Sequence, residues 1–191
     1  MLRTRGDSSL SPYGGRVQTR IEVRPVKGDE HRAAGAATAR AYEEFAPQRR
    51  DGWLAYLDRI ADVGGRAERA TVLVAIVDGH VAGSVTLELD RRIREDPESP
   101  LAPDEAHVRM LGVDPAYRGR GIARALMNGS VEVVREHGKR RITLDTAPEM
   151  RAAQALYEGM GFRRTATRDM GDDFCLYSYE LGLDSPAPQH P

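Results

Sequence analysis

The residues best placed to do chemistry lie where a short turn runs into an apolar helical pattern. That segment reads Val113-Asp114-Pro115-Ala116-Tyr117-Arg118-Gly119-Arg120-Gly121-Ile122-Ala123. Glycines let a phosphate approach without a Cβ in the way, and the first amides of a helix attract anions. The spacing excludes a dinucleotide fingerprint, which would need a small residue at Arg124, and the chain has no G-x-x-x-x-G-K-[ST] loop. On spacing alone, the alternative is a glycine-rich turn that binds nothing.

Alternating strand and helix patterns surround this loop. Strands are predicted at 20–26, 71–77, 81–89, 106–113, 141–146, 164–170 and 174–181, and helices at 29–45, 51–63, 121–137 and 149–160. Asp78-Gly79 joins two β-branched runs and predicts a hairpin. The order β-α-α-β-β-β-α-β-α-β-β predicts an α/β (α+β) fold, a mixed, mostly antiparallel central sheet flanked by helices.

Composition predicts one folded domain at 20–181. The ends, 1–19 and 182–191, are rich in Gly, Pro and Ser and are expected to be disordered tails. No apolar run is long enough to span a membrane, so no membrane partner is expected. A net charge of −1, from 28 basic and 29 acidic residues, gives no reason to expect nucleic-acid binding.

Cysteine and histidine usage argues against a metal site. Cys175 is the only cysteine, which excludes an internal disulfide framework and a multi-cysteine metal site. The histidines show no metal-ligand spacing, so no metal is expected. The first residues lack the apolar stretch of a secretory signal, and a reducing, cytoplasmic setting fits best.

Three linked motifs resemble the GNAT superfamily of acetyl-CoA-dependent N-acetyltransferases. Arg118 to Ala123 resembles its R/Q-x-x-G-x-G/A loop, and Leu111 to Pro115 resembles the strand end that pairs with pantetheine. Ala152 to Phe162 resembles its A-x-x-L-Y-x-x-x-G-F helix. The similarity covers roughly 70–181 well and 20–70 only in the order of the elements. It implies a single GNAT-like domain.

The resemblance implies acetyl-CoA as the co-substrate, held by backbone groups. The pyrophosphate would lie on the amides of Arg118, Gly119, Arg120, Gly121, Ile122 and Ala123. The pantetheine arm would run beside Leu111, Gly112 and Val113 and point the thioester into a gap between the strands 106–113 and 141–146. Many relatives have Asn where this chain has Met150, so a polar side-chain contact is expected to be missing there.

The resemblance also suggests an acid and a base. Tyr157 occupies the position of the tyrosine that often protonates the departing thiolate; alternatively, it is only a packing residue. His107 lies where several relatives place a Glu or His, and an ordinary imidazole pKa near 6.5 allows it to take a proton at neutral pH. The alternatives are a hydrogen-bonded strand histidine, Glu88 acting through water, or no dedicated base.

The implied function is transfer of the acetyl group to an amine acceptor, a small molecule or a peptide or lysine amine, by direct attack in a ternary complex. One alternative is an acetyl-CoA-binding sensor or regulatory protein without turnover, and another is a longer acyl donor. The loop at 90–105 is expected to border the acceptor, where its acidic residues would favour a cation unless they are merely solvated. Relatives often dimerise through the closing strands, which brings a homodimer into consideration.

Overall fold

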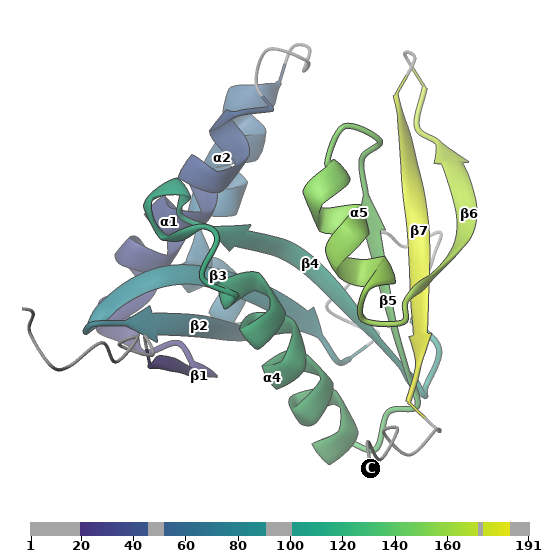
Figure 1. Ribbon diagram of the computed structural model, residues 1–191, viewed down its shortest axis with the longest axis horizontal. Helices are drawn as coiled ribbons and strands as arrows, with labels where there is room; N and C mark the ends of the chain where they lie inside the picture. The colour runs from purple at the N-terminus through teal and green to yellow at the C-terminus, as the bar shows by residue number, and fades with distance from the viewer. Residues whose placement is uncertain (1–19, 46–51, 91–100, 172–173, 184–191) are drawn as a thin grey trace, which may run out of the picture.

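A mixed sheet forms the centre of the computed structural model, which describes residues 20–45, 52–90, 101–171 and 174–183 (Figure 1). Its seven strands follow the order β1-β2-β3-β4-β5-β7-β6. The strands are β1 (Ile21–Pro25), β2 (Thr71–Val77), β3 (His80–Glu88), β4 (Glu105–Val113), β5 (Arg141–Thr146), β6 (Arg163–Asp169) and β7 (Cys175–Gly182). The helices are α1 (His31–Glu43), α2 (Trp53–Ala61), α3 (Val63–Ala67), α4 (Ile122–Glu136) and α5 (Arg151–Glu158), with 3₁₀ turns η1 (Gly28–Glu30) and η4 (Pro115–Tyr117).

The predicted order of strands and long helices is confirmed. The hairpin at Asp78-Gly79 is present, with positive φ values of 51° and 79° that suit a tight turn between antiparallel strands. Helix α3 was not predicted, because the Gly64-Gly65 pair disfavours a helix; it forms where the Asp62 side chain accepts a hydrogen bond from the Gly65 amide at 2.9 Å. The two predicted tails, apart from 182–183, and residues 91–100 of the predicted acceptor loop lie outside the described residues.

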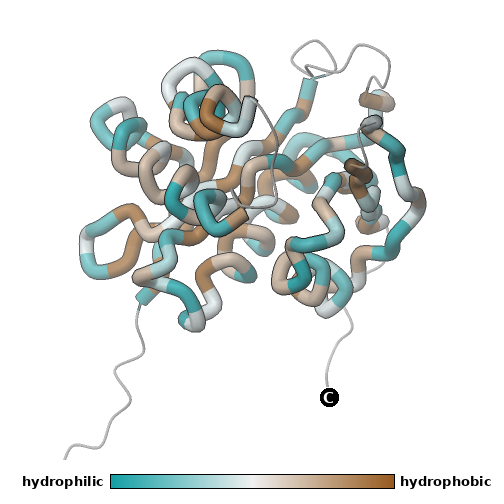
Figure 2. The backbone as a smooth tube through the Cα atoms, turned by 90° about the horizontal axis from the view of Figure 1, so that it is seen from above, coloured by the Kyte–Doolittle hydropathy of each residue, from teal (hydrophilic) through white to brown (hydrophobic). Residues whose placement is uncertain are grey.

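Apolar clusters on both faces of the sheet hold the layers together. The larger cluster packs α4 and α5 against the strands β2, β3, β4, β5 and β7. Its buried residues include Leu73, Val85, Leu126 and Leu144. A smaller cluster lies under α1 and α3 on the other face. Hydrophilic segments occupy much of the outer surface of the helices (Figure 2). Alternate residues of a strand point to opposite faces, so the cluster that a residue joins shows which face of the sheet it lies on.

The strands β4 and β5 separate part of the way along their length (Figure 1). They are the one parallel pair among the described strands, matched only over Glu105–Val108 and Arg141–Leu144. Beyond Val108, β4 pairs with β3 alone. Met110 has a φ of 53° and lies in a bulge, because the pairing passes from Thr86↔Arg109 to Ser84↔Gly112 with one extra residue in β4. One edge of β4 therefore faces the diverging strand without a partner.

Helix α1 packs very closely on its neighbours. A Cβ at Gly35 would lie 2.0 Å from the carbonyl oxygen of Ala61, so α1 and α2 approach at a point that only glycine allows. The buried Thr38 and Ser84 hydroxyls are 2.6 Å apart and link α1 to β3. These contacts fix the helices that cover one face of the sheet.

Substituting Gly35 by alanine tests this close approach. Alanine favours a helix by roughly 1 kcal/mol, but overpacking typically costs about 1–3 kcal/mol, and here the obstacle is backbone. We therefore expect Gly35→Ala to lower the free energy of unfolding measured by chemical denaturation. Gly28→Ala is the control, because nothing lies within 4 Å of its added Cβ. Equal stability of the two variants would show that α1 and α2 can move apart without cost.

Candidate functional site

The loop before α4 presents open backbone geometry at a helix N-terminus. Gly119 and Gly121 have φ values of 76° and 78°, and a Cβ added to either would meet nothing within 4 Å. The first amides of any α-helix have no intrahelical partner. Gly121, the N-cap of α4, supplies no side-chain cap for them either. Amides at a helix N-terminus attract anions. This loop has the form of a phosphate cradle.

The basic side chains in this loop serve mainly to hold it in place. Arg118 donates to the carboxylate of Glu44 at 2.7 and 3.0 Å and to the Ala41 carbonyl at 3.2 Å, at the C-terminal end of α1. The Arg120 guanidinium lies 5.4 Å from the centre of the Tyr117 ring. A phosphate in the cradle would therefore be bound chiefly by the backbone.

Asp114 fixes the turn that leads into the cradle. Its carboxylate accepts from the Ala116 amide at 3.0 Å and from Arg40 at 2.5 Å. Burial alone would raise the pKa of Asp114, but these two partners outweigh it and hold the pKa below its usual value. The ionised carboxylate ties the turn to α1.

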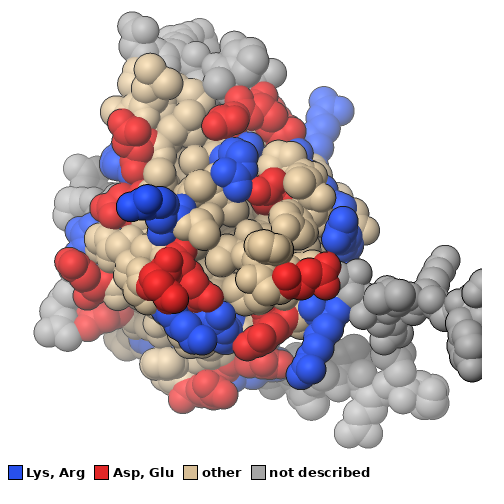
Figure 3. All heavy atoms as spheres, turned by 90° about the vertical axis from the view of Figure 1, so that its left-hand side faces the viewer, with Lys and Arg blue, Asp and Glu red and all other residues tan. Residues whose placement is uncertain are grey.

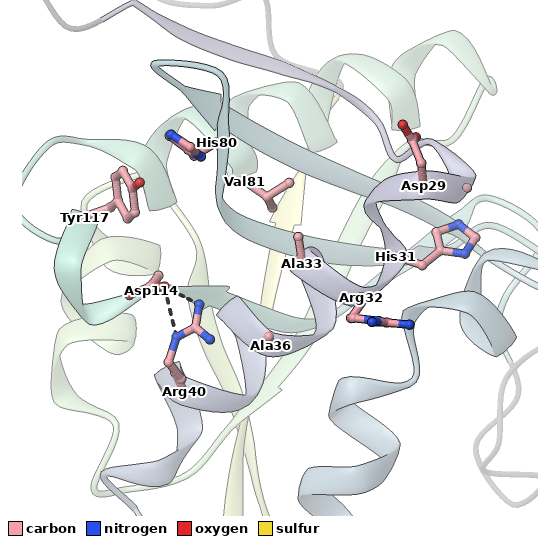
Figure 4. Close-up of a pocket in the computed structure, with 11 residues that line it drawn as sticks. Asp29, His31, Arg32, Ala33, Ala36, Arg40, His80, Val81, Asp114 and Tyr117 are labelled. Carbon is pink, nitrogen blue, oxygen red and sulfur yellow. Dashed lines mark hydrogen bonds and ion pairs between the residues drawn. The ribbon is translucent and has the colours of Figure 1, made fainter.

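A cavity of about 930 Å³ lies beside this turn (Figure 4). The Arg40–Asp114 ion pair lies in its wall, and Tyr117 and His80 face it from the loop and the β2–β3 turn. None of the predicted acid and base residues lines it. On the face of the molecule shown in Figure 3, acidic and basic side chains are intermingled, so no patch of one sign dominates that face.

Tyr157, the predicted acid, is buried among aromatic rings on α5. Tyr157 on α5 is 6% exposed, and its ring packs 5.8 Å from that of Phe162 and 6.0 Å from that of Tyr179. Burial raises the pKa of Tyr157, so its phenol keeps its proton at neutral pH. Burial also raises the pKa of Tyr42 on α1, and the neighbouring phenols of Tyr56 and Tyr157 raise it further. Tyr157 is therefore close enough to α1 for electrostatic interaction.

His107 faces the α1–α2 side of the sheet, because its neighbours Ala106 and Val108 enter the cluster on the other face. It is 7% exposed, and its Nδ1 lies 2.9 Å from the Thr143 hydroxyl oxygen. Thr143 donates its one proton to Glu105 at 2.6 Å, so its oxygen must accept from His107 Nδ1–H. In the neutral ring, Nε2 is then the basic nitrogen.

Glu88 lies directly across from His107 on β3. It is 3% exposed; Oε1 accepts from Arg109 at 2.8 Å, and the buried Oε2 has no hydrogen-bond partner. The sequence had offered Glu88 as an alternative to His107, and the structure brings the two onto one sheet face. Arg109 was missed, although its spacing of two from His107 along a strand could have found it.

Two further features of the site were also missed from the sequence. Arg66 of α3 reaches β3, where its Nε donates to the Thr86 hydroxyl at 3.2 Å. On β5, the Thr146 hydroxyl is buried without a partner in the described part of the chain. Thr146 follows the point where β5 leaves β4, so an unsatisfied polar group lies near the gap. Met150 precedes α5 and provides no side-chain cap.

These features fit the parts of acetyl-CoA. The open cradle suits a pyrophosphate, and the unpaired edge of β4 can hydrogen-bond an amide-bearing arm as an added strand would. Among the described residues, no cluster of three His, Cys, Asp or Glu side chains could hold a metal ion. Nor is any helix in the described ranges long and apolar enough to cross a membrane.

Comparison with known proteins gives a family match. The model of the acetyltransferase (GNAT) family matches residues 36–162. A stretch of 66 residues is 42% identical to mycothiol acetyltransferase of Beutenbergia cavernae, covering 34% of this chain and 22% of that protein. A stretch of 58 residues is 38% identical to N-alpha-acetyltransferase 30 of Schizosaccharomyces pombe, covering 30% of this chain and 39% of that protein. The chain thus spans less than half of either relative.

Solved structures share the fold. The ribosomal-protein-S18-alanine N-acetyltransferase of Escherichia coli superposes with a TM-score of 0.61 at 18% identity, covering 90% of this chain and 99% of that one. YncA of Salmonella typhimurium, solved with its cofactor acetyl-CoA, gives 0.64 at 20% identity and covers 88% and 97%. The PaiA N-acetyltransferase of Thermoplasma acidophilum, in complex with coenzyme A, gives 0.67 at 13% identity and covers 85% and 99%.

A charge at the cradle tests whether it binds phosphate. Gly121→Asp places a carboxylate where the phosphate would lie, and loss of charge-assisted hydrogen bonds should weaken CoA binding by about tenfold or more, measured by calorimetry. Gly138→Asp is the matched control, because Gly138 has a φ of 67° and equally open surroundings beyond the other end of α4. If both variants bind CoA like the wild type, the loop is not the phosphate site.

Proposed function

Because this chain belongs to the GNAT acetyltransferase family, we propose that it transfers the acetyl group of acetyl-CoA to an amine acceptor by direct attack in a ternary complex. One observation carries the proposal: the open cradle before α4 follows the unpaired edge of β4, which borders the gap before β5, the strand that leads to Tyr157 on α5. A bound thioester would then have its sulfur near a protonated phenol. A cytoplasmic setting belongs to this proposal and rests on the single cysteine of the chain.

In the proposed reaction, the neutral amine forms a bond to the thioester carbonyl carbon and the carbon–sulfur bond breaks. His107 takes a proton from the attacking nitrogen through Nε2, and Tyr157 gives its hydroxyl proton to the departing sulfur. Burial weakens Tyr157 as an acid, but the same desolvation destabilises a thiolate beside it and favours transfer of the proton. Acid and base approach the gap from opposite faces of the sheet.

The family match leaves the acceptor open. The relatives differ in the acceptor that their names give: one is a mycothiol acetyltransferase, and others are N-acetylaspartate synthetases. We therefore propose for this chain only the activity that these relatives share, which is acetylation of an amine. The identity of the amine must come from its own residues.

Removing one phenol oxygen tests the acid. Tyr157→Phe should lower kcat by about 10²–10⁴, since a positioned acid is typically worth that much, and should leave CoA affinity unchanged. Tyr179→Phe is the matched control, because its ring packs on Tyr157 while its hydroxyl donates to Glu158 at 2.9 Å. Thiol release with an accepted amine measures both. Wild-type kcat in Tyr157→Phe would make Tyr157 a packing residue.

The base can be tested through the residue that orients it. His107→Gln should cost about 10²–10⁴ in kcat. Thr143→Val removes the acceptor for Nδ1–H and should give a smaller loss, whereas Thr143→Ser keeps a hydroxyl and should restore the rate. Nitrogen-15 shifts of the His107 ring should show the proton on Nδ1 in the wild type and in Thr143→Ser only. An unchanged rate in His107→Gln would transfer the role to Glu88 or to solvent.

A further inference from the structure

On the α1–α2 face of the sheet, two buried charged groups each have one polar atom that finds no hydrogen-bond partner among the described residues. Arg66 is 8% exposed and Glu88 is 3% exposed. Arg66 uses Nη1 on the Arg59 carbonyl at 2.5 Å and Nε on Thr86, but Nη2 is buried without a partner. Glu88 uses Oε1 on Arg109, but Oε2 is buried without a partner. An unsatisfied buried ionic group is costly, so a ligand that supplies its partner gains accordingly.

One unsatisfied atom belongs to Glu88 of β3, and the other belongs to Arg66 of α3, whose side chain is anchored at a neighbouring position of the same strand face. Arg66 is anchored on Thr86, which lies two residues before Glu88 on β3, a spacing of about 7 Å on the same face. One unsatisfied group is a cationic donor and the other an anionic acceptor. A small molecule with an ammonium and a carboxylate on adjacent carbons or on one carbon would offer a partner to each group.

No described carboxylate accepts a hydrogen bond from Arg66. Asp62 attracts the Arg66 charge electrostatically, but its carboxylate accepts from the Gly65 amide. Burial lowers the pKa of Arg66, and the Arg109 guanidinium lowers it further, so an added anion would be favoured there. Tyr42 and Tyr56 lie close enough to interact with Arg66 electrostatically, and their rings pack edge to face at 6.3 Å.

We propose that the acceptor is an amino-carboxylate, an α-amino acid or a close analogue, with its carboxylate on Arg66 Nη2 and its amine on Glu88 Oε2. This inference deepens the proposed acetyl transfer and rests on it. Glu88 lies directly across from His107, so the amine held by Glu88 lies beside the group that removes its proton. Arg109 orients Glu88 from the adjacent strand.

Matched substrate pairs test the carboxylate. Thiol release is measured with L-phenylalanine and phenethylamine, L-tyrosine and tyramine, and L-leucine and isoamylamine, each pair differing only by the carboxylate. We expect the amino acid of an accepted pair to have a kcat/KM about 10–100-fold above that of its amine, the range for a hydrogen bond to a charged group. Equal values within every accepted pair in the wild type would overturn the inference, whatever happens to any variant.

Variants connect the preference to Arg66. Arg66→Gln should abolish the preference for the amino acid, and Arg66→Lys, which keeps a cation, should retain part of it. Arg69→Gln is the control, because Arg69 is partly exposed and donates only to the Gly65 carbonyl at 3.3 Å. A folded Arg66→Gln with the wild-type preference would overturn the inference. If Arg66→Gln does not fold, the preference for the amino acid over its amine is compared between Arg66→Lys and the wild type instead.

Calorimetry separates this inference from the proposed function. The same amino acids are titrated into the protein with CoA present, where no transfer can occur. If the wild type binds the amino acids, Arg66→Gln does not, and no amine gives thiol release, the amino-carboxylate site is supported and acetyl transfer is refuted. Equal thiol release for amino acids and their amines would support acetyl transfer and refute the amino-carboxylate site.

Discussion

The short parallel pairing of β4 with β5 is the constraint on which the rest of the site depends. The two strands are held together only over Glu105–Val108 and Arg141–Leu144. If the pairing continued to Val113, the edge of β4 would be satisfied by β5 and no chain could be added there. Because it stops, that edge is available, and groups from the two faces of the sheet come within electrostatic reach of each other, as Tyr157 and Tyr42 do. The bulge at Met110 increases the local twist and turns β4 away.

Helix α1 connects the two halves of the site. Its C-terminal end receives Arg118 from the cradle, and Arg40 binds Asp114 from the preceding turn. Its inner face is locked onto β3 by Thr38 and Ser84. The same helix carries Tyr42, next to the two guanidinium groups on the acceptor side. A shift of α1 would therefore move the loop before α4 and the residues around Arg66 together.

How much of this could be predicted from the sequence depends on how local each feature is. The hairpin at Asp78-Gly79 and the glycines of the cradle depend on the conformations of a few residues, and their types reveal them. The bulge at Met110 leaves no such sign, because methionine does not favour a positive φ. Arg66 is 20 residues from Thr86 in the chain, and a short helix that its glycines disfavour brings the two together. Side-chain partners set by strand register, such as Glu88 and His107, also required the paired sheet.

The two buried charged groups on this face of the sheet have a physical reason in the proposed site. Two buried ionic groups with one unsatisfied atom each lower the stability of the free protein, and apolar residues of the same volume would generally be more stable. Arg66 and Glu88 are instead held rigidly, one by Thr86 and the Arg59 carbonyl and the other by Arg109. Groups that are already desolvated and oriented lose little entropy when a ligand completes their hydrogen bonds. In the proposed site, the unsatisfied atoms lower the stability of the free protein and favour a ligand that carries both charges. That ligand would bind on the face of the sheet where His107 lies.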